Sequence, residues 1–215
     1  MRRHDFIYVC PAAWRSLLKR REDLAGEPLV ASWVDRGWPL IGRRALPGED
    51  DGLALGLPLP PFAGKKRLGL LMRAEDIVTI ASPPSLGSVR ETAPSAWRPT
   101  LDALCEFAAR NFVDARVYGS LAWQVLTGLQ YLSETSDLDL ILNMYHRASV
   151  GDIAAGIAAI ETSAPMRIDG EVIRDDGAAV NWREIHAGPR EILVKSADGV
   201  FLLDVNAFHV TQAAL

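Results

Sequence analysis

Two aspartates at the start of an apolar strand are the residues of this sequence best placed for chemistry. Asp137 and Asp139 flank Leu138, and apolar residues continue to Leu142. Side chains two apart on a strand share a face, so both carboxylates should project together, with Leu138 and Leu140 on the opposite, buried side. Adjacent carboxylates repel each other unless a divalent cation lies between them, and Mg²⁺ favours oxygen ligands. The pair therefore predicts a metal site.

A glycine and a serine precede this pair, between an expected strand and an expected helix. Residues 116–118 predict a short strand, and apolar residues recur at helical spacing over residues 121–129. A helix that begins at Ser120 points unpaired backbone N–H groups at the turn, where Gly119 lets an anion approach closely. The turn therefore predicts a phosphate-binding site.

Each feature has an ordinary structural explanation when it is taken alone. Gly119-Ser120 is compatible with any helix N-cap, and Asp-x-Asp at a strand start is commonly a solvated edge. The complete order is more specific: strand, Gly-Ser, helix, polar loop, and an apolar strand that carries Asp137 and Asp139. In this order the residues resemble the signature of the nucleotidyltransferase superfamily related to DNA polymerase beta.

That resemblance implies a third carboxylate, on a strand paired with the one that carries Asp137 and Asp139. Asp169 matches this role by its order in the chain and its place in an alternating strand, residues 166–173. Glu171 would share the face of Asp169 and is the reserve candidate. For both acids the alternative is a polar, solvent-facing strand. The resemblance also implies Mg²⁺ as cofactor, with Asp137, Asp139 and Asp169 as metal ligands and catalytic residues.

Basic residues elsewhere are candidates for binding substrate phosphates. Lys65, Lys66 and Arg67 follow Gly64 at an expected turn, and such a turn can grip phosphate, end an exposed hairpin or protect an edge strand. Lys195 ends a later strand, where it could meet a polyphosphate or simply be solvated. The expected phosphate-binding residues are Gly119, Ser120, Lys65, Lys66, Arg67 and Lys195.

The composition is that of an ordinary soluble protein. The 215 residues are 49% hydrophobic and 23% charged, with a formal net charge of −4, which argues against a general nucleic-acid binder and against polymerase activity on long templates. No apolar run approaches the ~20 residues of a membrane span, and residues 1–9 lack the pattern of a signal peptide. Cys10 and Cys105 are expected to be reduced thiols, so we expect a cytoplasmic protein without nucleic-acid or membrane partners.

The pattern predicts an α+β fold in two parts. A small, mostly β subdomain is expected at residues 1–85, and a nucleotidyltransferase-like mixed sheet with flanking helices at residues 86–215. Frequent glycine and proline over residues 26–80 predict short strands joined by turns rather than helices, and residues 82–99 are the expected linker. Other expected elements are a strand at residues 6–9, a helix from Pro11, helices at residues 101–108 and 152–160, and strands at residues 191–196 and 201–205.

Over nearly its full length the sequence also resembles one narrower family, the phosphoribosyl-dephospho-CoA transferase of bacterial malonate decarboxylase, also called its holo-acyl-carrier-protein synthase. Only the nucleotidyltransferase part of this resemblance is a specific signature. The matching pieces are Arg3-His4-Asp5, Gly37-Trp38-Pro39, Arg43-Arg44, Gly56-Leu57, Pro60-Pro61, the basic turn at residues 64–67, Tyr118-Gly119-Ser120, Asp137 with Asp139, Asp169-Gly170-Glu171 and Trp182-Arg183-Glu184.

This resemblance implies a reaction. The enzyme would move the phosphoribosyl-dephospho-CoA prosthetic group from 2'-(5''-triphosphoribosyl)-3'-dephospho-CoA to a serine of the malonate decarboxylase acyl carrier protein subunit, releasing pyrophosphate. Asp137 and Asp139 would bridge two Mg²⁺ ions, Asp169 would help to deprotonate the incoming hydroxyl, and Ser120 would hold the departing pyrophosphate.

Other functions stay open at this point. The same chemistry would serve a nucleotidyltransferase that uses ATP or CTP on a small-molecule or RNA acceptor. A non-catalytic module that binds the carrier protein would have no need of clustered acids, and a metal-dependent sugar transferase would need a longer nucleotide-sugar domain. Arg43-Arg44 and residues 65–67 could either dock an acidic carrier protein or grip the phosphates of a CoA-like donor.

Overall fold

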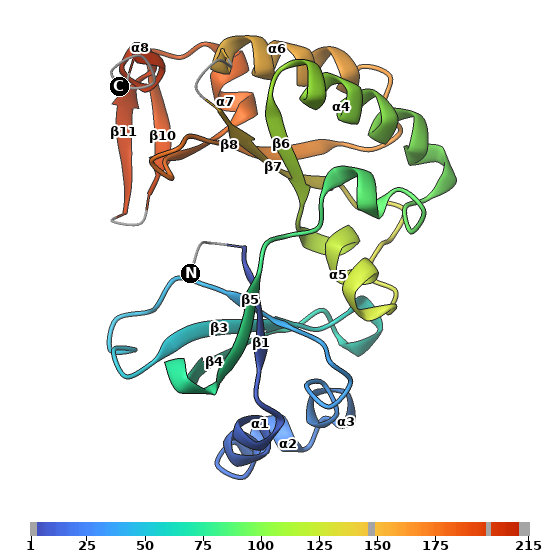
Figure 1. Ribbon diagram of the computed structural model, residues 1–215, viewed down its shortest axis with the longest axis vertical. Coiled ribbons are helices and arrows are strands. Elements are labelled where there is room, and N and C mark those ends of the chain that lie inside the picture. Colours follow the sequence, from blue (N-terminus) through green and yellow to red (C-terminus); the bar gives the residue numbers. More distant parts are fainter. Residues whose placement is uncertain (1–3, 146–148, 197–198, 211–215) are drawn as a thin grey trace. The chain divides into compact units, whose positions relative to one another are not determined.

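The chain divides into two units, each with its own β-sheet, in the computed structural model (Figure 1). The first unit is Met1–Pro83 with Leu126–Tyr131, and the second is Pro84–Val125 with Leu132–Leu215. The structure describes residues 4–145, 149–196 and 199–210. Arg3, part of the resemblance above, lies outside these residues. The expected α+β class is confirmed by the mixture of helices and two sheets.

The first unit is built on an antiparallel sheet of five strands in the order β4-β3-β2-β1-β5. Short apolar runs form these strands, and glycine or proline residues lie between the successive strands β1 to β4, as the sequence predicted, whereas residues 73–76 between β4 and β5 contain neither. Its elements are β1 (Phe6–Val9), α1 (Pro11–Leu18), α2 (Glu22–Ala25), α3 (Pro28–Ala31), β2 (Leu40–Gly42), β3 (Leu53–Pro58), η1 (Pro61–Ala63), β4 (Arg67–Met72), η2 (Ala74–Asp76) and β5 (Ile77–Ala81).

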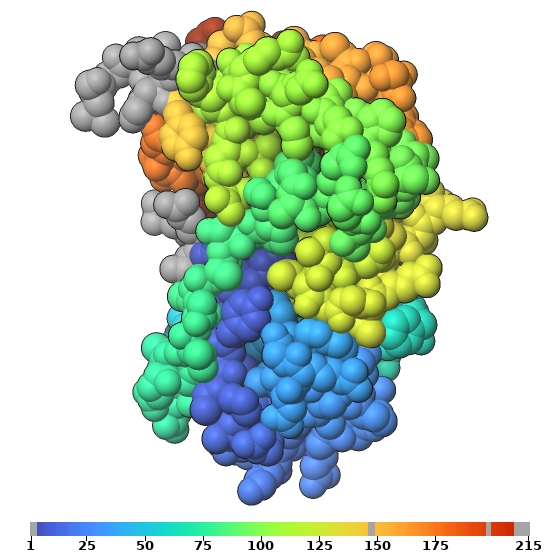
Figure 2. All heavy atoms as spheres, turned by 45° about the vertical axis from the view of Figure 1, so that its right-hand side comes forward, coloured from blue at the N-terminus to red at the C-terminus, as the bar shows by residue number. Residues whose placement is uncertain are grey.

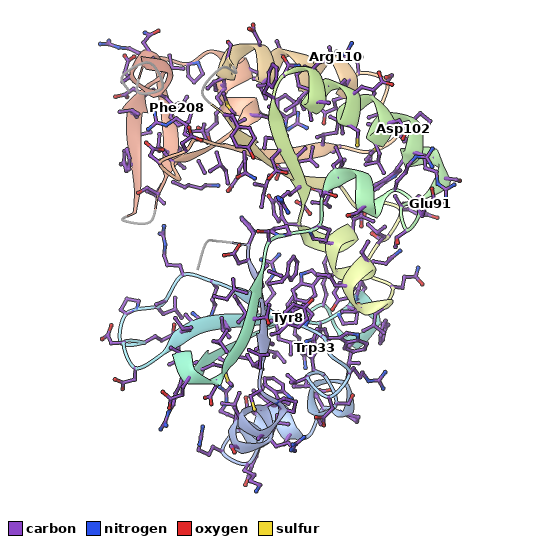
Figure 3. All side chains as sticks on the ribbon, viewed as in Figure 1. Tyr8, Trp33, Glu91, Asp102, Arg110 and Phe208 are labelled. Carbon is purple, nitrogen blue, oxygen red and sulfur yellow. The ribbon has the colours of Figure 1, made fainter. Side chains whose placement is uncertain are left out.

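Two tryptophans hold the short helices of this unit together. Trp14 of α1 and Trp33 are both fully buried, and each indole N–H donates to a backbone carbonyl, Trp14 to Val30 at 3.2 Å and Trp33 to Pro39 at 2.9 Å. Buried indoles need such an acceptor. Trp33, labelled in Figure 3, also meets Trp38 edge-on at 4.9 Å between ring centroids.

The expectation of strands and turns alone over residues 26–80 was wrong at helix α3 and at the short 3-10 helices η1 and η2. Helix α3 begins at Pro28, where the sequence suggested a turn. Proline fits the first position of a helix because the N–H that it lacks has no helical partner there. A single proline therefore did not distinguish a turn from a helix start.

The second unit is built on a mixed sheet of six strands in the order β11-β10-β9-β8-β7-β6. Strands β7 and β8 run parallel, whereas the other neighbouring pairs are antiparallel. Its elements are η3 (Leu86–Val89), η4 (Ser95–Trp97), α4 (Arg98–Arg110), β6 (Val113–Val117), α5 (Gly119–Thr127), β7 (Leu138–Met144), α6 (Val150–Glu161), β8 (Ile168–Ile173), β9 (Ala179–Asn181), α7 (Trp182–Ala187), β10 (Glu191–Lys195), β11 (Val200–Asp204) and α8 (Val205–Val210).

Three helices, α4, α6 and α7, cover one face of this sheet (Figure 1). Alternate residues of β7, including Leu138 and Leu140, are fully buried beneath them. Helices α4 and α6 approach closely at Gly156, where an added Cβ would lie 2.1 Å from the Phe107 ring. The outer side of α4 is exposed, as Figure 2 shows. The opposite face of the sheet is left for polar side chains.

The expected linker at residues 82–99 is not a free connection, which corrects that prediction. From Ser85 onward it packs on the second unit: Ser85 forms a β-bridge with Arg116, and Val89 and Trp97 are buried. Arg90 joins this segment to α4 by an ion pair with Asp102 and also pairs with its own neighbour Glu91; Asp102 and Glu91 are labelled in Figure 3. Prolines here shape a packed segment rather than a flexible one.

Helix α5 is shorter than the apolar spacing predicted. Helix α5 ends at Thr127 because Gly128 is left-handed, with φ +71°, so Leu129 lies outside the helix that the apolar spacing predicted.

Cys10 and Cys105 are both free cysteines, as expected. Among the described residues, no helix has the length and apolar character to cross a membrane.

Candidate metal and phosphate site

Three aspartates come together on the open face of the second sheet. Asp137, Asp139 and Asp169 each offer one carboxylate oxygen, and these atoms lie within 4.8 Å of one another. All three side chains are partly exposed. The structure thus brings together the residues that the sequence nominated as metal ligands, while their binding of a metal stays a prediction.

Parallel pairing of β7 with β8 explains this meeting. Asp139 lies directly opposite Asp169 in the register, and Leu138 lies opposite Ile168. Since side chains alternate between faces, the leucine and isoleucine point into the core and the two aspartates to the other face. Asp137 immediately precedes β7 and reaches the same face. Apolar alternation in two strands is therefore what sets the acidic residues side by side.

Gly119, the first residue of α5, lies against the acidic cluster. Its φ is +65°, and a Cβ added to it would lie 1.8 Å from Asp139 Oδ2. The backbone N–H of Tyr118 donates to the Asp139 carbonyl at 3.1 Å, which fixes the turn beside the strand. The glycine therefore leaves room for the Asp139 carboxylate, and the start of α5, with Ser120, adjoins the cluster.

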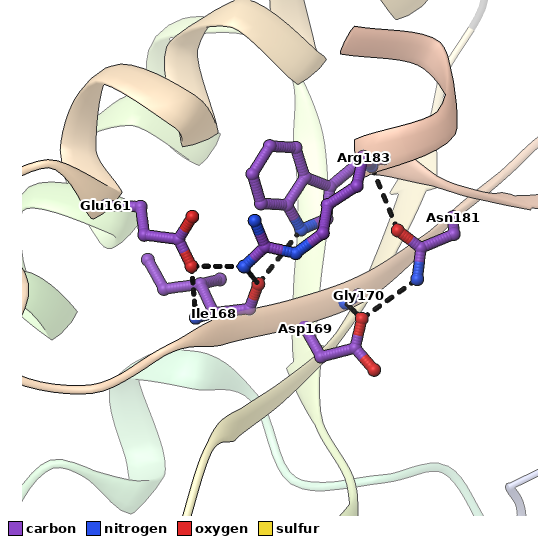
Figure 4. Close-up of polar contacts among 7 residues, drawn as sticks. Glu161, Ile168, Asp169, Gly170, Asn181 and Arg183 are labelled. Carbon is purple, nitrogen blue, oxygen red and sulfur yellow. Dashed lines mark hydrogen bonds and ion pairs between the residues drawn. The ribbon is translucent and has the colours of Figure 1, made fainter. Parts of the chain in front are cut away.

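The Asp169 carboxylate is held by two donors on one oxygen (Figure 4). Oδ1 accepts from the backbone N–H of Gly170 at 3.0 Å and from Asn181 Nδ2 at 2.8 Å. Among the described residues, Asp169 Oδ2 has no hydrogen-bond partner. One oxygen is thus fixed and the other is left for a ligand.

An ion-pair network anchors the start of β8, one residue before Asp169 (Figure 4). Arg183 donates to Glu161 and to the Ile168 carbonyl, the latter at 2.9 Å, and Glu161 accepts from the Ile168 N–H at 2.7 Å. The Trp182 indole donates to the same carbonyl at 3.2 Å. Helices α6 and α7 are therefore tied to the strand that carries the third carboxylate.

The pKa of Glu161 reflects opposing influences in this network. Burial is the largest single influence and raises the pKa, but the hydrogen bonds from Arg183 and from the Ile168 backbone, with the positive charges of Arg183 and Arg167, together outweigh it. The pKa of Glu161 therefore lies below its ordinary value. Glu161 is consequently a charged, structural partner of Arg183.

Glu171, the reserve candidate, has a different environment from Asp169. Its side chain is only 5% exposed, and Lys195 Nζ lies 2.8 Å from its Oε1. A buried carboxylate requires a partner of this kind. From the sequence, Lys195 was expected to bind phosphate. In this structure its ammonium group contacts Glu171 instead.

The remaining basic candidates belong to the first unit. Lys65 and Lys66 are exposed on the turn between β3 and β4, where Lys65 has a left-handed backbone, φ +53°, and the exposed Arg67 begins β4. Arg43, in contrast, forms a two-pronged ion pair with Glu49, both contacts at 2.7 Å, which lowers the Glu49 pKa to about 2. Arg43 therefore has a structural partner, whereas residues 65–67 keep exposed cations, of which Lys66 makes one long ion pair, 4.0 Å, with Glu27.

The donor set fits a hard divalent cation. Three carboxylate oxygens within one small region repel each other unless positive charge lies between them. Oxygen ligands of this kind suit Mg²⁺, which commonly uses a few carboxylates together with substrate phosphates. The fit rests on the chemistry and spacing of Asp137, Asp139 and Asp169.

Comparisons with known proteins decide the family. Two family models match the chain: the phosphoribosyl-dephospho-CoA transferase MdcG N-terminal domain over residues 2–83 and its C-terminal domain over residues 85–206. The chain belongs to the phosphoribosyl-dephospho-CoA transferase family. The family resemblance inferred from the sequence is thus confirmed.

Curated relatives in this transferase family match most of the chain. A phosphoribosyl-dephospho-CoA transferase of Bradyrhizobium diazoefficiens is 55% identical over 96% of this chain and 91% of the relative. One of Xanthomonas axonopodis pv. citri is 33% identical over 99% of this chain and 98% of the relative. No solved structure matches the chain.

The sequence reasoning missed the residues that support Asp169. Asn181, Arg183 and Glu161 lie 8 to 14 residues away in the chain, and their contacts depend on how β9, α6 and α7 meet β8. Asparagine before a helix is a sequence signal for an N-cap, and Asn181 does cap α7. Nothing in the local pattern connects this cap to Asp169.

Proposed function

We propose that this protein is a Mg²⁺-dependent nucleotidyltransferase of the malonate decarboxylase system. It transfers the phosphoribosyl-dephospho-CoA group from 2'-(5''-triphosphoribosyl)-3'-dephospho-CoA to a serine of the acyl carrier protein subunit and releases pyrophosphate. The observation that carries this proposal is the convergence of Asp137, Asp139 and Asp169 beside the start of α5. The family name of the relatives supports the transferred group.

Each residue of the cluster has a role in this proposal. Bound Mg²⁺ would neutralise charge on the reacting phosphate and on the departing pyrophosphate. Asp137 and Asp139 would hold the cation from the start of β7, and Asp169 would also bind it, nearest the incoming serine hydroxyl, and help to accept the proton of that hydroxyl. A bond forms from the serine oxygen to phosphorus while the bond from phosphorus to the pyrophosphate oxygen breaks. Ser120 and the first N–H groups of α5 hold the departing pyrophosphate.

Intact-mass analysis of the acyl carrier subunit tests this proposal directly. The subunit should gain the mass of the prosthetic group when it is incubated with enzyme, triphosphoribosyl precursor and Mg²⁺, and pyrophosphate should appear in equal amount. Asp137→Asn and Asp139→Asn should slow transfer about 100-fold or more, the cost of removing one group that stabilises a charged transition state. Asp51→Ala, which removes an exposed carboxylate of the first unit, should leave the rate unchanged.

The same assay separates the competing functions. Pyrophosphate release with ATP or CTP in place of the precursor, without modification of the carrier, would favour a different acceptor. Binding of the carrier subunit without any gain in mass would favour a non-catalytic module. Near-normal transfer by Asp137→Asn or Asp139→Asn would refute the metal-dependent mechanism.

A further inference from the structure

Asn181 connects the third carboxylate of the cluster to the start of α7. Its Oδ1 accepts from the backbone N–H of Arg183 at 2.9 Å, and its Nδ2 donates to Asp169 Oδ1 at 2.8 Å. A backbone N–H can only donate, so the first contact fixes which end of the amide faces Asp169. The Asn181 side chain therefore presents a donor, in one orientation, to Asp169 (Figure 4).

Strand register shows why this contact goes to Asp169 and not to the nearer acid. Asn181 of β9 lies directly opposite Glu171 of β8, and Asp169 is its diagonal neighbour on the same face. Glu171 is already paired with Lys195. The asparagine amide is thus directed to the one carboxylate of β8 that belongs to the cluster.

We infer that Asn181 is a positioning residue for the metal-binding carboxylates, an inference that rests on the proposed function. Like-charge repulsion from Asp137 and Asp139 would turn the Asp169 side chain away from them. The Asn181 amide and the Gly170 N–H oppose this by holding Oδ1, so that Oδ2 stays available to a cation. Outer residues that orient metal ligands in this way contribute strongly to metal affinity.

Capping of α7 is a second role of Asn181, and the test must separate the two. Asn181→Ser and Asn181→Thr retain an N-cap oxygen for Arg183 but lack the amide group that reaches Asp169. Ser149→Ala is the matched control, because the Ser149 hydroxyl caps α6 by accepting from the Asp152 N–H at 3.3 Å. It removes a cap from a neighbouring helix and leaves Asp169 untouched.

Mn²⁺ serves as the probe, measured by electron paramagnetic resonance with the full chain and no substrate. Asn181→Ser should melt near the wild-type temperature yet bind Mn²⁺ about 10- to 100-fold more weakly. Its transfer rate should need a correspondingly higher Mg²⁺ concentration and recover toward wild type at saturation. Ser149→Ala should melt at a lower temperature and bind Mn²⁺ as wild type does.

Three outcomes would overturn the inference. Wild-type Mn²⁺ affinity in both Asn181→Ser and Asn181→Thr would show that the amide does not position Asp169. Equal weakening of Mn²⁺ binding by Ser149→Ala would reduce the effect to general destabilisation. Absence of Mn²⁺ binding by the wild-type protein, or binding that Asp137→Asn leaves unchanged, would instead overturn the metal site of the proposed function and the positioning role with it.

Discussion

Gly119 shows how one residue can set the geometry of the candidate site. Its left-handed backbone turns the chain from β6 into α5, and its missing side chain leaves the space that Asp139 occupies. From the sequence, this glycine was expected to make room for an anion. The neighbouring anion in the structure is a carboxylate of the protein itself, close to the positive end of a helix.

We predict that Gly119→Ala reduces transfer far more than it reduces stability. A left-handed alanine costs about 1–2 kcal/mol in folding free energy, whereas the added methyl group would also displace the Asp139 carboxylate, with which it would overlap. Transfer rates and urea unfolding, measured on the same preparation, check this. The expected result is a moderate loss of stability with a rate lowered about 100-fold or more.

Gly188→Ala is the matched control for this substitution. Gly188 follows α7 with the same φ of +65°, and a Cβ added to it would meet no atom within 4 Å. It should therefore lose a similar amount of stability and retain the transfer rate. Equal rates in the two variants would show that the space beside Asp139 does not matter.

At the level of elements, alternation and helical spacing predicted most of the strands and long helices. β1 spans Phe6–Val9 as expected, and α4 and α6 enclose the two helices expected from apolar spacing. The pairing of the acid-bearing strands also followed from the sequence, through the superfamily resemblance. These predictions succeeded for one reason: a strand or helix with one buried face has apolar residues at the spacing of that face.

Contacts between distant elements could not be predicted in this way. The pairing of Lys195 with Glu171 depends on the register in which β9 pairs with β8 and β10 pairs with β9. The residue pattern of a single strand does not determine that register. The same holds for Arg183 and Glu161, which meet only because α6 and α7 pack together. Asp169 itself was found because it lies in an alternating strand and matches the third carboxylate that the resemblance implies, whereas Asn181 ends a strand of only three residues, too short to show a pattern.

The tie between α6 and β8 gives a prediction about pH. The Glu161 pKa is lower in the folded protein than its ordinary value of 4.5, so its stabilising effect is complete above that value and is lost as the pH falls through the folded-state pKa. Glu161→Gln should lower the free energy of unfolding by roughly 2 kcal/mol at neutral pH, the scale of a hydrogen bond to a charged group. Urea unfolding at several pH values measures this difference.

The difference between Glu161→Gln and wild type should shrink as the pH falls below 4.5 and through the lowered folded-state pKa of Glu161, where the wild-type carboxylate takes up its proton. Glu106→Gln is the control, since Glu106 is exposed on the neighbouring helix α4 and makes no hydrogen bond among the described residues. A difference for Glu161→Gln that stays constant down to acid pH would contradict the assigned role.

At the scale of the whole molecule, net charge and local charge differ. The chain carries a formal net charge of −4, yet the β3–β4 turn of the first unit presents Lys65, Lys66 and Arg67 to solvent. Arg43, by contrast, is neutralised by Glu49. Among the basic groups nominated from the sequence, residues 65–67 and Arg44 therefore keep exposed positive charge for an anionic substrate.

We predict that the double variant Lys65→Gln/Lys66→Gln raises the KM for the triphosphoribosyl precursor and leaves kcat nearly unchanged. Each exposed cation contributes about 0.7 kcal/mol to an ionic contact, so two lost contacts amount to roughly a tenfold rise. The effect should diminish at high salt, because screening weakens such contacts in the wild-type protein. Steady-state kinetics at two ionic strengths, varying precursor and carrier separately, measure it.

Lys19→Gln/Arg20→Gln is the matched control, because it removes two positive charges from the same unit at an exposed helix end. An equal rise in KM for both double variants would show that only overall charge matters. A rise in KM for the carrier alone would assign the turn to the protein partner instead of the precursor. A rise for the precursor alone, absent in the control, would place Lys65 and Lys66 among the residues that bind its phosphates.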